Sequence, residues 1–312
     1  MGIDRKALVA CWTVLNGTLC QGIQRQNRTP SQRLVEPLAD DGLLARPGRI
    51  WTREKLDYLK KYAAAFMTAM AKKKWDGLVY IDLLCGPGRD LEKETGEQFL
   101  GSPLIALSTK PPFSHLYLAD KSERNIRALE KRIPDADKSR VSLTPGDCNV
   151  VVDDVLKKVS DRTLGLAFID PEGFEVDFAT LAKLAKRRID LIYLFPSGIG
   201  VKRNLKNFLP LTNTPMDKFW GGKDWRDLPE ARRAAGTLHE ETPERIVTSL
   251  VSAFRRKLKE VGFSHQDEAV PLKNTKNAQM YHLLYLSHAE VGRKIWRGIK
   301  KISPGGQRSF DY

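Results

Sequence analysis

A glycine-rich turn preceded by an acid is the strongest chemical signal in the sequence. The apolar run Leu78–Leu84 contains Asp82, and Gly86 and Gly88 follow it closely. Glycine allows a tight turn and lets a ligand approach the backbone. In open α/β sheets, ligands bind where the carboxyl ends of the strands meet. We therefore expect a ligand site at this turn, and the alternative is a tight strand-to-helix turn that binds nothing.

The spacing of this turn separates it from two common nucleotide sites. Residues 82–89 match neither the GxGxxG of a dinucleotide site nor the GxxxxGK(S/T) of a phosphate loop. An acid followed by GxG resembles instead the first motif of S-adenosylmethionine-dependent methyltransferases. That resemblance implies that Asp82 supports the methionine end of the cofactor, and that the backbone at Gly86 and Gly88 lies under it.

Two more predicted strand ends carry polar groups suited to the same cofactor. Asp120 ends the run 116–120, where such enzymes bind the ribose hydroxyls, because a carboxylate can accept a hydrogen bond from each of them. Asp147 and Asn149 follow the run 141–144, and we expect them to meet the adenine amino group. An Asx turn that caps the next helix explains the same two residues and is compatible with this role.

The fourth strand end carries the catalytic argument. Residues 168–174 read FIDPEGF and resemble the Asp/Asn-Pro-Pro-aromatic motif of methyltransferases that modify exocyclic amines. Such an amine is a poor nucleophile because its lone pair is delocalised into the ring. Asp170 and the backbone carbonyl beside Pro171 would accept hydrogen bonds from the N–H groups of this amine. Methyl transfer would then depend on the placement of the amine and on electrostatic stabilisation. A glutamate and a glycine replace the usual second proline and aromatic residue. This form of the motif is closer to the DPxG of N2-guanine tRNA methyltransferases. Without the usual aromatic residue, Phe174 or another ring would have to stack on the base. A strand followed by a proline turn is the alternative.

The charge of the chain favours a polyanionic partner. Lys and Arg number 52 against 38 Asp and Glu, and the net charge of +14 would attract nucleic acid and permit contacts to its phosphates. High solubility alone is the alternative explanation. Lys202 and Arg203 come soon after the fifth predicted strand, where a substrate phosphate could reach them.

Composition excludes several other classes of protein. A hydrophobic content of 41% with 29% charged residues is typical of globular chains. No apolar run approaches the ~18 residues of a membrane-spanning helix, and the five histidines lack metal-ligand spacing. The four cysteines are too few and too far apart for a zinc ribbon or a secreted disulfide scaffold. We therefore expect a cytoplasmic protein with no metal site and no membrane association.

These residues need a scaffold that gathers strand ends, and the order of the predicted elements supplies one. Short apolar runs without polar alternation predict strands covered on both faces. Predicted strands cover 78–84, 115–119, 141–144, 164–169 and 190–195, and predicted helices cover 102–107, 123–132, 150–159 and 178–186. This alternation predicts an α/β fold with a doubly wound, mostly parallel, Rossmann-like sheet of the class I methyltransferase type.

The flanking segments complete a single predicted domain over residues 49–312. An amphipathic helix with Thr52 as its N-cap forms an N-terminal helical extension, and residues 1–48 are expected to be a poorly ordered leader. Residues 89–101 read as an inserted loop, and 196–244 as an insertion or lid after the fifth strand, because that segment is rich in Gly, Pro, Trp and charge. Helices over 243–260 and 290–301 and a closing strand pair over 269–272 and 280–287 finish the chain.

Taken in order, the motifs of this chain are similar to those of the three-Cys-motif partner proteins (TcmP). The matching segments are Trp51-x-x-x-Lys55-Leu, YIDLLCGPGR, Gly101-Ser-Pro-Leu-Ile-Ala-Leu, Gly146-Asp-Cys-Asn149, FIDPEG, Phe195-Pro with Arg203-Asn, Met216-Asp-x-Phe-Trp-Gly221 and Gly292-x-x-x-Trp296. They cover roughly residues 40–308, and the ordered set is more specific than any one member. The resemblance implies a methyltransferase-like Rossmann domain and a separate neighbouring protein with three cysteines. It does not supply a substrate.

Two functional hypotheses follow from the sequence. The first is an enzyme that transfers a methyl group from S-adenosylmethionine to an amine, with an exocyclic base amine of nucleic acid as the expected acceptor. The second is a non-catalytic Rossmann-like module that binds nucleic acid or a partner protein. The presence of all six residues Asp82, Gly86, Gly88, Asp120, Asp147 and Asp170 favours the enzyme. The sequence leaves open whether DNA, RNA or protein is modified, and which oligomer the chain forms.

Overall fold

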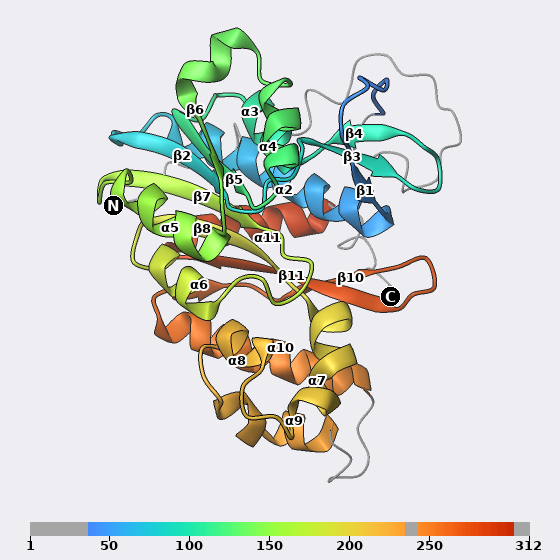
Figure 1. The fold of residues 1–312 in the computed structure, drawn as a ribbon. Helices are drawn as coiled ribbons and strands as arrows, with labels where there is room; N and C mark the ends of the chain where they lie inside the picture. Colours follow the sequence, from blue (N-terminus) through green and yellow to red (C-terminus); the bar gives the residue numbers. More distant parts are fainter. Residues whose placement is uncertain (1–36, 235–242, 303–312) are drawn as a thin grey trace.

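The apolar runs of the sequence form the strands of one mixed sheet with helices on both faces (Figure 1). The computed structural model describes residues 37–234 and 243–302. Five strands are parallel, in the order β6 (Val141–Pro145), β5 (His115–Asp120), β2 (Gly77–Asp82), β7 (Thr163–Ile169) and β8 (Ile189–Phe195). Next to β8 come the antiparallel strands β11 (Gln279–Ser287) and β10 (Val270–Lys273), and the short β9 (His265–Gln266) also pairs with β11. This order confirms the predicted class I methyltransferase-type sheet.

Strand β2 is central, as expected from the sequence. It pairs in parallel with β5 on one side and β7 on the other, so that Asp82 lies opposite Leu118 and Phe168. Parallel strands end at the same edge of a sheet, and the loops after β2, β5 and β7 therefore meet there. The sheet thus brings the neighbourhoods of Asp82, Asp120 and Asp170 together.

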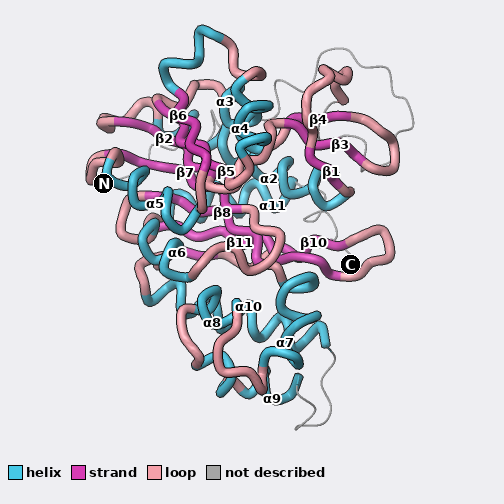
Figure 2. Tube along the Cα trace, in the orientation of Figure 1, coloured by secondary structure: helices cyan, strands magenta, loops and turns pink. Residues whose placement is uncertain are grey.

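Side chains of the central strands alternate between two hydrophobic cores. This alternation follows from the two-residue period of a β-strand. The helices that cover these cores flank the strands of the sheet in Figure 2. One core packs under α5 (Cys148–Lys157), α6 (Phe178–Leu184) and α10 (Pro243–Glu260). The other packs under α2 (Ile50–Met70), α3 (Ser102–Ser108), α4 (Glu123–Glu130) and α11 (Glu290–Ile302). Both faces of the sheet are covered, which is why its strands lack polar alternation.

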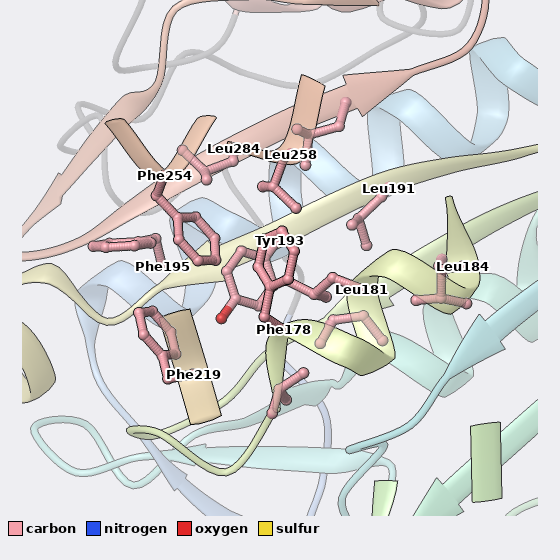
Figure 3. Packing of buried hydrophobic residues seen from close by; sticks show 14 of the residues in the cluster. Phe178, Leu181, Leu184, Leu191, Tyr193, Phe195, Phe219, Phe254, Leu258 and Leu284 are labelled. Atoms are coloured by element: carbon pink, nitrogen blue, oxygen red, sulfur yellow. The ribbon is translucent and has the colours of Figure 1, made fainter. Parts of the chain in front are cut away.

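The segment after β8, predicted as an insertion or lid, is helical and packs on the first of these cores. It contains a π-helical turn η3 (Ser197–Lys202), helices α7 (Arg203–Phe208), α8 (Pro215–Trp220) and α9 (Pro229–Ala234), and a short 3-10 turn η4 (Asp224–Asp227). Phe219 of α8 stacks on Phe254 of α10 with ring centroids 5.1 Å apart, and Phe178 and Phe195 surround them (Figure 3). Its use as a lid stays a prediction, and residues 235–242 of this segment lie outside the described residues.

Three local predictions differ from the structure. Residues 37–48 of the predicted leader are described and contain strand β1 (Arg46–Gly48), whereas residues 1–36 lie outside the described residues. The predicted inserted loop is a hairpin of β3 (Arg89–Glu92) and β4 (Gln98–Leu100), and β1 pairs with it to form a small second sheet. The N-cap of α2 is Arg49, three residues before the predicted Thr52. Thr52 is the third residue of the helix, and its hydroxyl accepts a hydrogen bond from the Arg49 N–H at 3.1 Å.

A buried polar network fixes α2 against the sheet. Asp190 of β8 accepts hydrogen bonds from the hydroxyls of Tyr62 (2.6 Å), Tyr285 (3.2 Å) and Ser287 (2.5 Å). Burial raises the pKa of Asp190 above its ordinary value. The network joins α2 to β8 and β11, and α2 carries four residues of the site described next, Trp51, Thr52, Lys55 and Leu56.

Candidate functional site

Asp82 lies fully buried at the end of β2, beneath the glycine turn. One carboxylate oxygen accepts hydrogen bonds from Ser102 Oγ at 2.6 Å and from the Tyr80 hydroxyl at 3.2 Å, and the other accepts from the Leu84 N–H at 3.2 Å. Burial raises the pKa of Asp82 to about 7 despite these donors. A buried acid with a raised pKa at a strand end is typical of functional sites.

The two glycines of the turn have different roles. Both have positive φ, +63° at Gly86 and +92° at Gly88, where other residues are strained. A Cβ at Gly86 would have only Arg46 Cδ within reach, at 3.9 Å, so its Cα faces open space. A Cβ at Gly88 would lie 2.8 Å from a methyl group of Leu129 and 3.3 Å from Leu104, so Gly88 faces packed side chains. The turn therefore offers bare backbone to a ligand at Gly86.

Asp120 joins the turns after β2 and β5. Its Oδ2 accepts a hydrogen bond from the Gly86 N–H at 2.9 Å, and its Oδ1 accepts from the Ser122 N–H at 2.8 Å and from Asn125 Nδ2 at 3.0 Å. The side chain is half-buried. Asp120 lies beside the glycine turn, as the sequence predicted, and in this structure its carboxylate organises that turn.

Asp147 and Asn149 are engaged in local structure. Asp147 is the N-cap of α5 and accepts a hydrogen bond from the Asn149 N–H at 2.9 Å, which confirms the Asx-turn interpretation. The Asn149 side chain accepts from the Asp177 N–H at 2.9 Å and donates to the Glu175 carbonyl at 2.8 Å. Asn149 therefore ties α5 to the loop after β7, while the half-buried Asp147 is the better placed of the two to meet a ligand.

Asp170 is held by two cations from distant parts of the chain. Lys55 Nζ of α2 contacts Asp170 Oδ2, and Arg46 Nη1 of β1 lies 3.6 Å from the same oxygen. Arg46 Nη2 also pairs with Glu172 at 2.9 Å. The side chains of Lys55 and Asp170 are only 7% and 8% exposed. Both cations use Oδ2, and no hydrogen bond from residues 37–234 or 243–302 reaches Oδ1.

Asp90 of β3 completes this cluster of charges. Burial raises its pKa to about 6, although Lys55 and Arg46 oppose the rise, and Asp170 adds to it. Two cations therefore face two buried carboxylates and the more exposed Glu172. The cluster is close to neutral, which lets it persist at low exposure.

Two clefts border this cluster. The inner cleft lies against the glycine turn and is lined by Leu56, Cys85, Gly86, Pro87, Gly88, Arg89, Gly101 and Ser102. The outer cleft is lined by Pro47, Arg49, Trp51, Thr52, Glu172, Leu194 and Tyr281. Arg46, Lys55, Asp90 and Asp170 line both, and we call these four residues the shared wall.

The two clefts differ in size. The inner cleft has a volume of about 10 Å³, which is about the space of one water molecule. The outer cleft has a volume of about 210 Å³. A cofactor in the inner cleft needs more room than this structure shows, and the partly exposed Arg46 is the most accessible member of the shared wall.

The remaining predicted residues lie elsewhere. Pro171 is buried directly beside Asp170. Phe174 packs against Phe208 and Phe219, with ring centroids 5.8 and 5.0 Å away, and lines a separate cavity of about 520 Å³. The expected stacking ring is therefore not in either cleft, because the chain after Pro171 turns toward the aromatic core. Lys202 and Arg203 are exposed around the junction of η3 and α7 and line neither cleft.

Sequence reasoning missed three members of the site. Arg46 lay in the predicted leader, Asp90 in the predicted inserted loop, and Tyr281 at the start of a closing strand. Trp51 and Lys55 were noticed only as letters of a motif. Their spacing of four on an amphipathic helix was a usable signal, because it places both on one face.

The comparisons with known proteins concern the fold alone. Neither the models of protein families nor the curated proteins gave a match. Among solved structures, protein LPL1258 of Legionella pneumophila is 13% identical with a TM-score of 0.47, over 81% of this chain and 92% of the other. A methyltransferase of Aquifex aeolicus dependent on S-adenosylmethionine is 10% identical with a TM-score of 0.35, over 67% and 81%. Trm1 of Pyrococcus horikoshii, in complex with S-adenosylmethionine, is 12% identical with a TM-score of 0.39, over 89% and 64%. The strand order of this chain, not these likenesses, carries the fold assignment.

Two further properties concern the part of the chain that the structure describes. No group of three or more His, Cys, Asp or Glu side chains within it is placed to hold a metal ion. No helix within it is long and apolar enough to cross a membrane.

Proposed function

We propose that this protein is an S-adenosylmethionine-dependent methyltransferase that acts on an amine, with an exocyclic base amine of nucleic acid as the acceptor. One observation carries the proposal: the inner and outer clefts share a wall that contains Asp170. A group transfer between two molecules needs two adjoining sites whose occupants meet at the reacting atoms. The net charge of +14 supports nucleic acid as the acceptor.

The residues around the inner cleft fit the proposed cofactor. A Cβ at Gly86 would project into the space that a ligand needs, and the buried Asp82 lies beneath the same turn. Asp120 and Asp147 line neither cleft in this structure, and they offer carboxylates at the next two strand ends for the ribose hydroxyls and the adenine amino group. S-adenosylmethionine supplies a methyl group on a sulfonium that is already an activated leaving group. The protein therefore needs to place and orient the acceptor more than to activate the donor.

Asp170 is the proposed orienting group for the acceptor amine. Lys55 and Arg46 hold its Oδ2, which leaves Oδ1 to accept an N–H of the amine. The nitrogen gains positive charge as its bond to the methyl carbon forms, and a nearby carboxylate stabilises that charge. The proton that the nitrogen then loses passes to Asp170 or to solvent. Lys55 is a positioning residue in this scheme, because it fixes the carboxylate that contacts the acceptor.

The resemblance to the TcmP family belongs to the same proposal. Trp51 and Lys55 of its first motif, the glycine turn of its second, and Asp170 and Glu172 of its fifth line the two clefts. These motifs are far apart in the sequence but lie together in the structure. Their proximity supports a shared function. We therefore propose membership of that family, a separate three-cysteine protein as a partner, and a cytoplasmic location.

One observation favours the second hypothesis, a non-catalytic binding module. The inner cleft is nearly filled, and the cations Lys55 and Arg46 lie beside the carboxylate that the reaction would use. Calorimetry with S-adenosylmethionine and S-adenosylhomocysteine separates the two hypotheses. An enzyme binds both, and a module that has lost the cofactor binds neither.

The catalytic assignment is tested with Asp170→Asn. We expect cofactor affinity within a few-fold of wild type and loss of tritiated methyl transfer onto mixed nucleic acids, because Asp170 contacts the acceptor and not the cofactor. Asp154→Asn, on the exposed face of α5, is the matched control and leaves both unchanged. Wild-type turnover by Asp170→Asn on an identified acceptor would remove Asp170 from the reaction.

A further inference from the structure

Aromatic rings line the outer cleft next to the shared wall. Trp51, at the start of α2, is half-buried, and Tyr281 of β11 is 6% exposed. They reach the cleft from two different elements, since α2 packs on one face of the sheet and β11 is a strand of it. Exposed or cleft-lining tryptophan and tyrosine rings give flat apolar surface with little loss of side-chain entropy.

The volume of the outer cleft limits what it can hold. Clefts that bind drug-sized ligands typically have volumes of about 300–1,000 Å³. At about 210 Å³, the outer cleft has room for one ring system and not for a folded peptide segment or a base pair. Its ligand is therefore small, or is one protruding part of a larger molecule.

The polar groups of the outer cleft include both acceptors and donors. Asp170 and Glu172 offer carboxylate oxygens, and Lys55 and Arg46 offer N–H groups. Arg49, exposed at the mouth, has its guanidinium carbon 5.6 Å from the centroid of the Trp51 ring. A nucleobase presents the matching set, with amino N–H groups, ring nitrogens or carbonyl oxygens on its edge, and a flat face for stacking.

We infer that the outer cleft binds one unpaired nucleobase, stacked on Trp51 and Tyr281 with its amino group toward Asp170. The inference rests on the proposed function, and it specifies which part of the acceptor this cleft binds. It replaces Phe174, which lies in another cavity, as the stacking surface. A base in a duplex would have to leave its stack to enter the cleft, so a single-stranded acceptor is bound in preference to a paired one.

Fluorescence anisotropy of short, labelled, mixed-sequence DNA and RNA strands tests the inference, with the full-length protein and saturating S-adenosylhomocysteine. We expect Trp51→Ala and Tyr281→Leu each to weaken binding on the order of tenfold, as for the loss of one base stack. Trp51→Phe and Tyr281→Phe keep a ring and most of the affinity, which separates stacking from misfolding. A labelled sugar-phosphate chain without bases should bind wild type and Trp51→Ala equally.

Trp75→Ala is the matched control. Trp75 is also half-buried, but it follows the far end of α2, a 21-residue helix about 30 Å long. We expect it to bind the strands like wild type. A Trp51→Ala protein with wild-type affinity, an equal loss in Trp75→Ala, or tighter binding of a duplex than of its single strands would overturn the inference.

The same proteins separate this inference from the proposed function. If calorimetry shows cofactor binding but the strands do not bind wild type, the base site is wrong and the methyltransferase proposal stands. If the cofactor does not bind but the strands bind through Trp51, the base site stands and the enzyme proposal is wrong.

Discussion

Replacing the buried acid under the glycine turn should stabilise the protein at neutral pH. Asp82 accepts hydrogen bonds from Ser102, Tyr80 and the Leu84 N–H, and no Lys, Arg or His of residues 37–234 and 243–302 forms an ion pair with it. In Asp82→Asn the amide oxygen can still accept from Leu84. The amide NH₂ can donate to the two hydroxyls, which then act as acceptors. The substitution therefore removes a buried charge while keeping the pattern of hydrogen bonds.

The size and sign of the effect follow from the pKa. Burial raises the pKa of Asp82 from 3.8 to about 7. Between these pH values the folded protein keeps a proton that the unfolded chain has released. The contribution of Asp82 to stability is therefore most favourable below about pH 4, falls as the pH rises, and levels off above about pH 7. At 1.36 kcal/mol per pKa unit, the full difference is about 4 kcal/mol.

Urea unfolding of wild type and Asp82→Asn from pH 5 to pH 8 measures this difference. We expect Asp82→Asn to be more stable at pH 8 by a few kcal/mol, with the gap narrowing toward pH 5. Asp161→Asn, an exposed carboxylate, is the control and should stay within about 0.5 kcal/mol of wild type throughout. A gap between Asp82→Asn and wild type that does not change with pH would refute the reasoning.

Two other substitutions test the packing around the site. Lys55→Met leaves the Asp170 carboxylate buried beside Arg46 alone and should cost about 3–5 kcal/mol of unfolding free energy. Adding Asp170→Asn should recover much of the lost stability. Urea unfolding of wild type, the two single variants and the double variant measures this in a double-mutant cycle. If the two changes in unfolding free energy are additive, Lys55 and Asp170 do not act as a pair. Gly292→Ala should destabilise by about 1–3 kcal/mol, because its Cβ would lie 2.2 Å from the Tyr285 hydroxyl. Gly298→Ala on the same helix meets nothing within 4 Å and should stabilise by up to about 1 kcal/mol, so thermal melts with equal shifts for both glycines would refute this account.

Local patterns in the sequence were enough to predict the sheet. Each parallel strand is a short run of apolar residues, and each predicted boundary lies within two residues of the observed one. Because alternating strands and helices have few ways to pack, the position of β2 between β5 and β7 also followed. The glycine turn and Asp82 were predicted for the same reason, since a strand end and its loop are adjacent in sequence.

The sequence was less informative where a local pattern had two physical explanations. Thr52 has the chemistry of an N-cap and lies at the start of an amphipathic run, but the helix begins earlier. Thr52 is the third residue of the helix, and its hydroxyl accepts a hydrogen bond from the N-cap residue Arg49. Residues 89–101 are polar enough for a loop, yet β3 and β4 pair with each other and β1 adds a third strand beside β3. Phe174 follows the Asp-Pro-Glu motif, but its ring packs against Phe208 and Phe219 and not beside the charges.

The sequence by itself determined the order of the strands and the acids at their ends, because those depend on residues that are neighbours along the chain. Only the tertiary structure decided which groups surround Asp170. Arg46, Lys55 and Asp90 come from a strand of the small sheet, a helix and a hairpin. Their contact depends on how these elements pack, and no spacing along the sequence encodes a distance through space. Buried charges must also be neutralised by whichever partners the packing brings near, so the shared wall and the two clefts beside it appear only once the chain is folded.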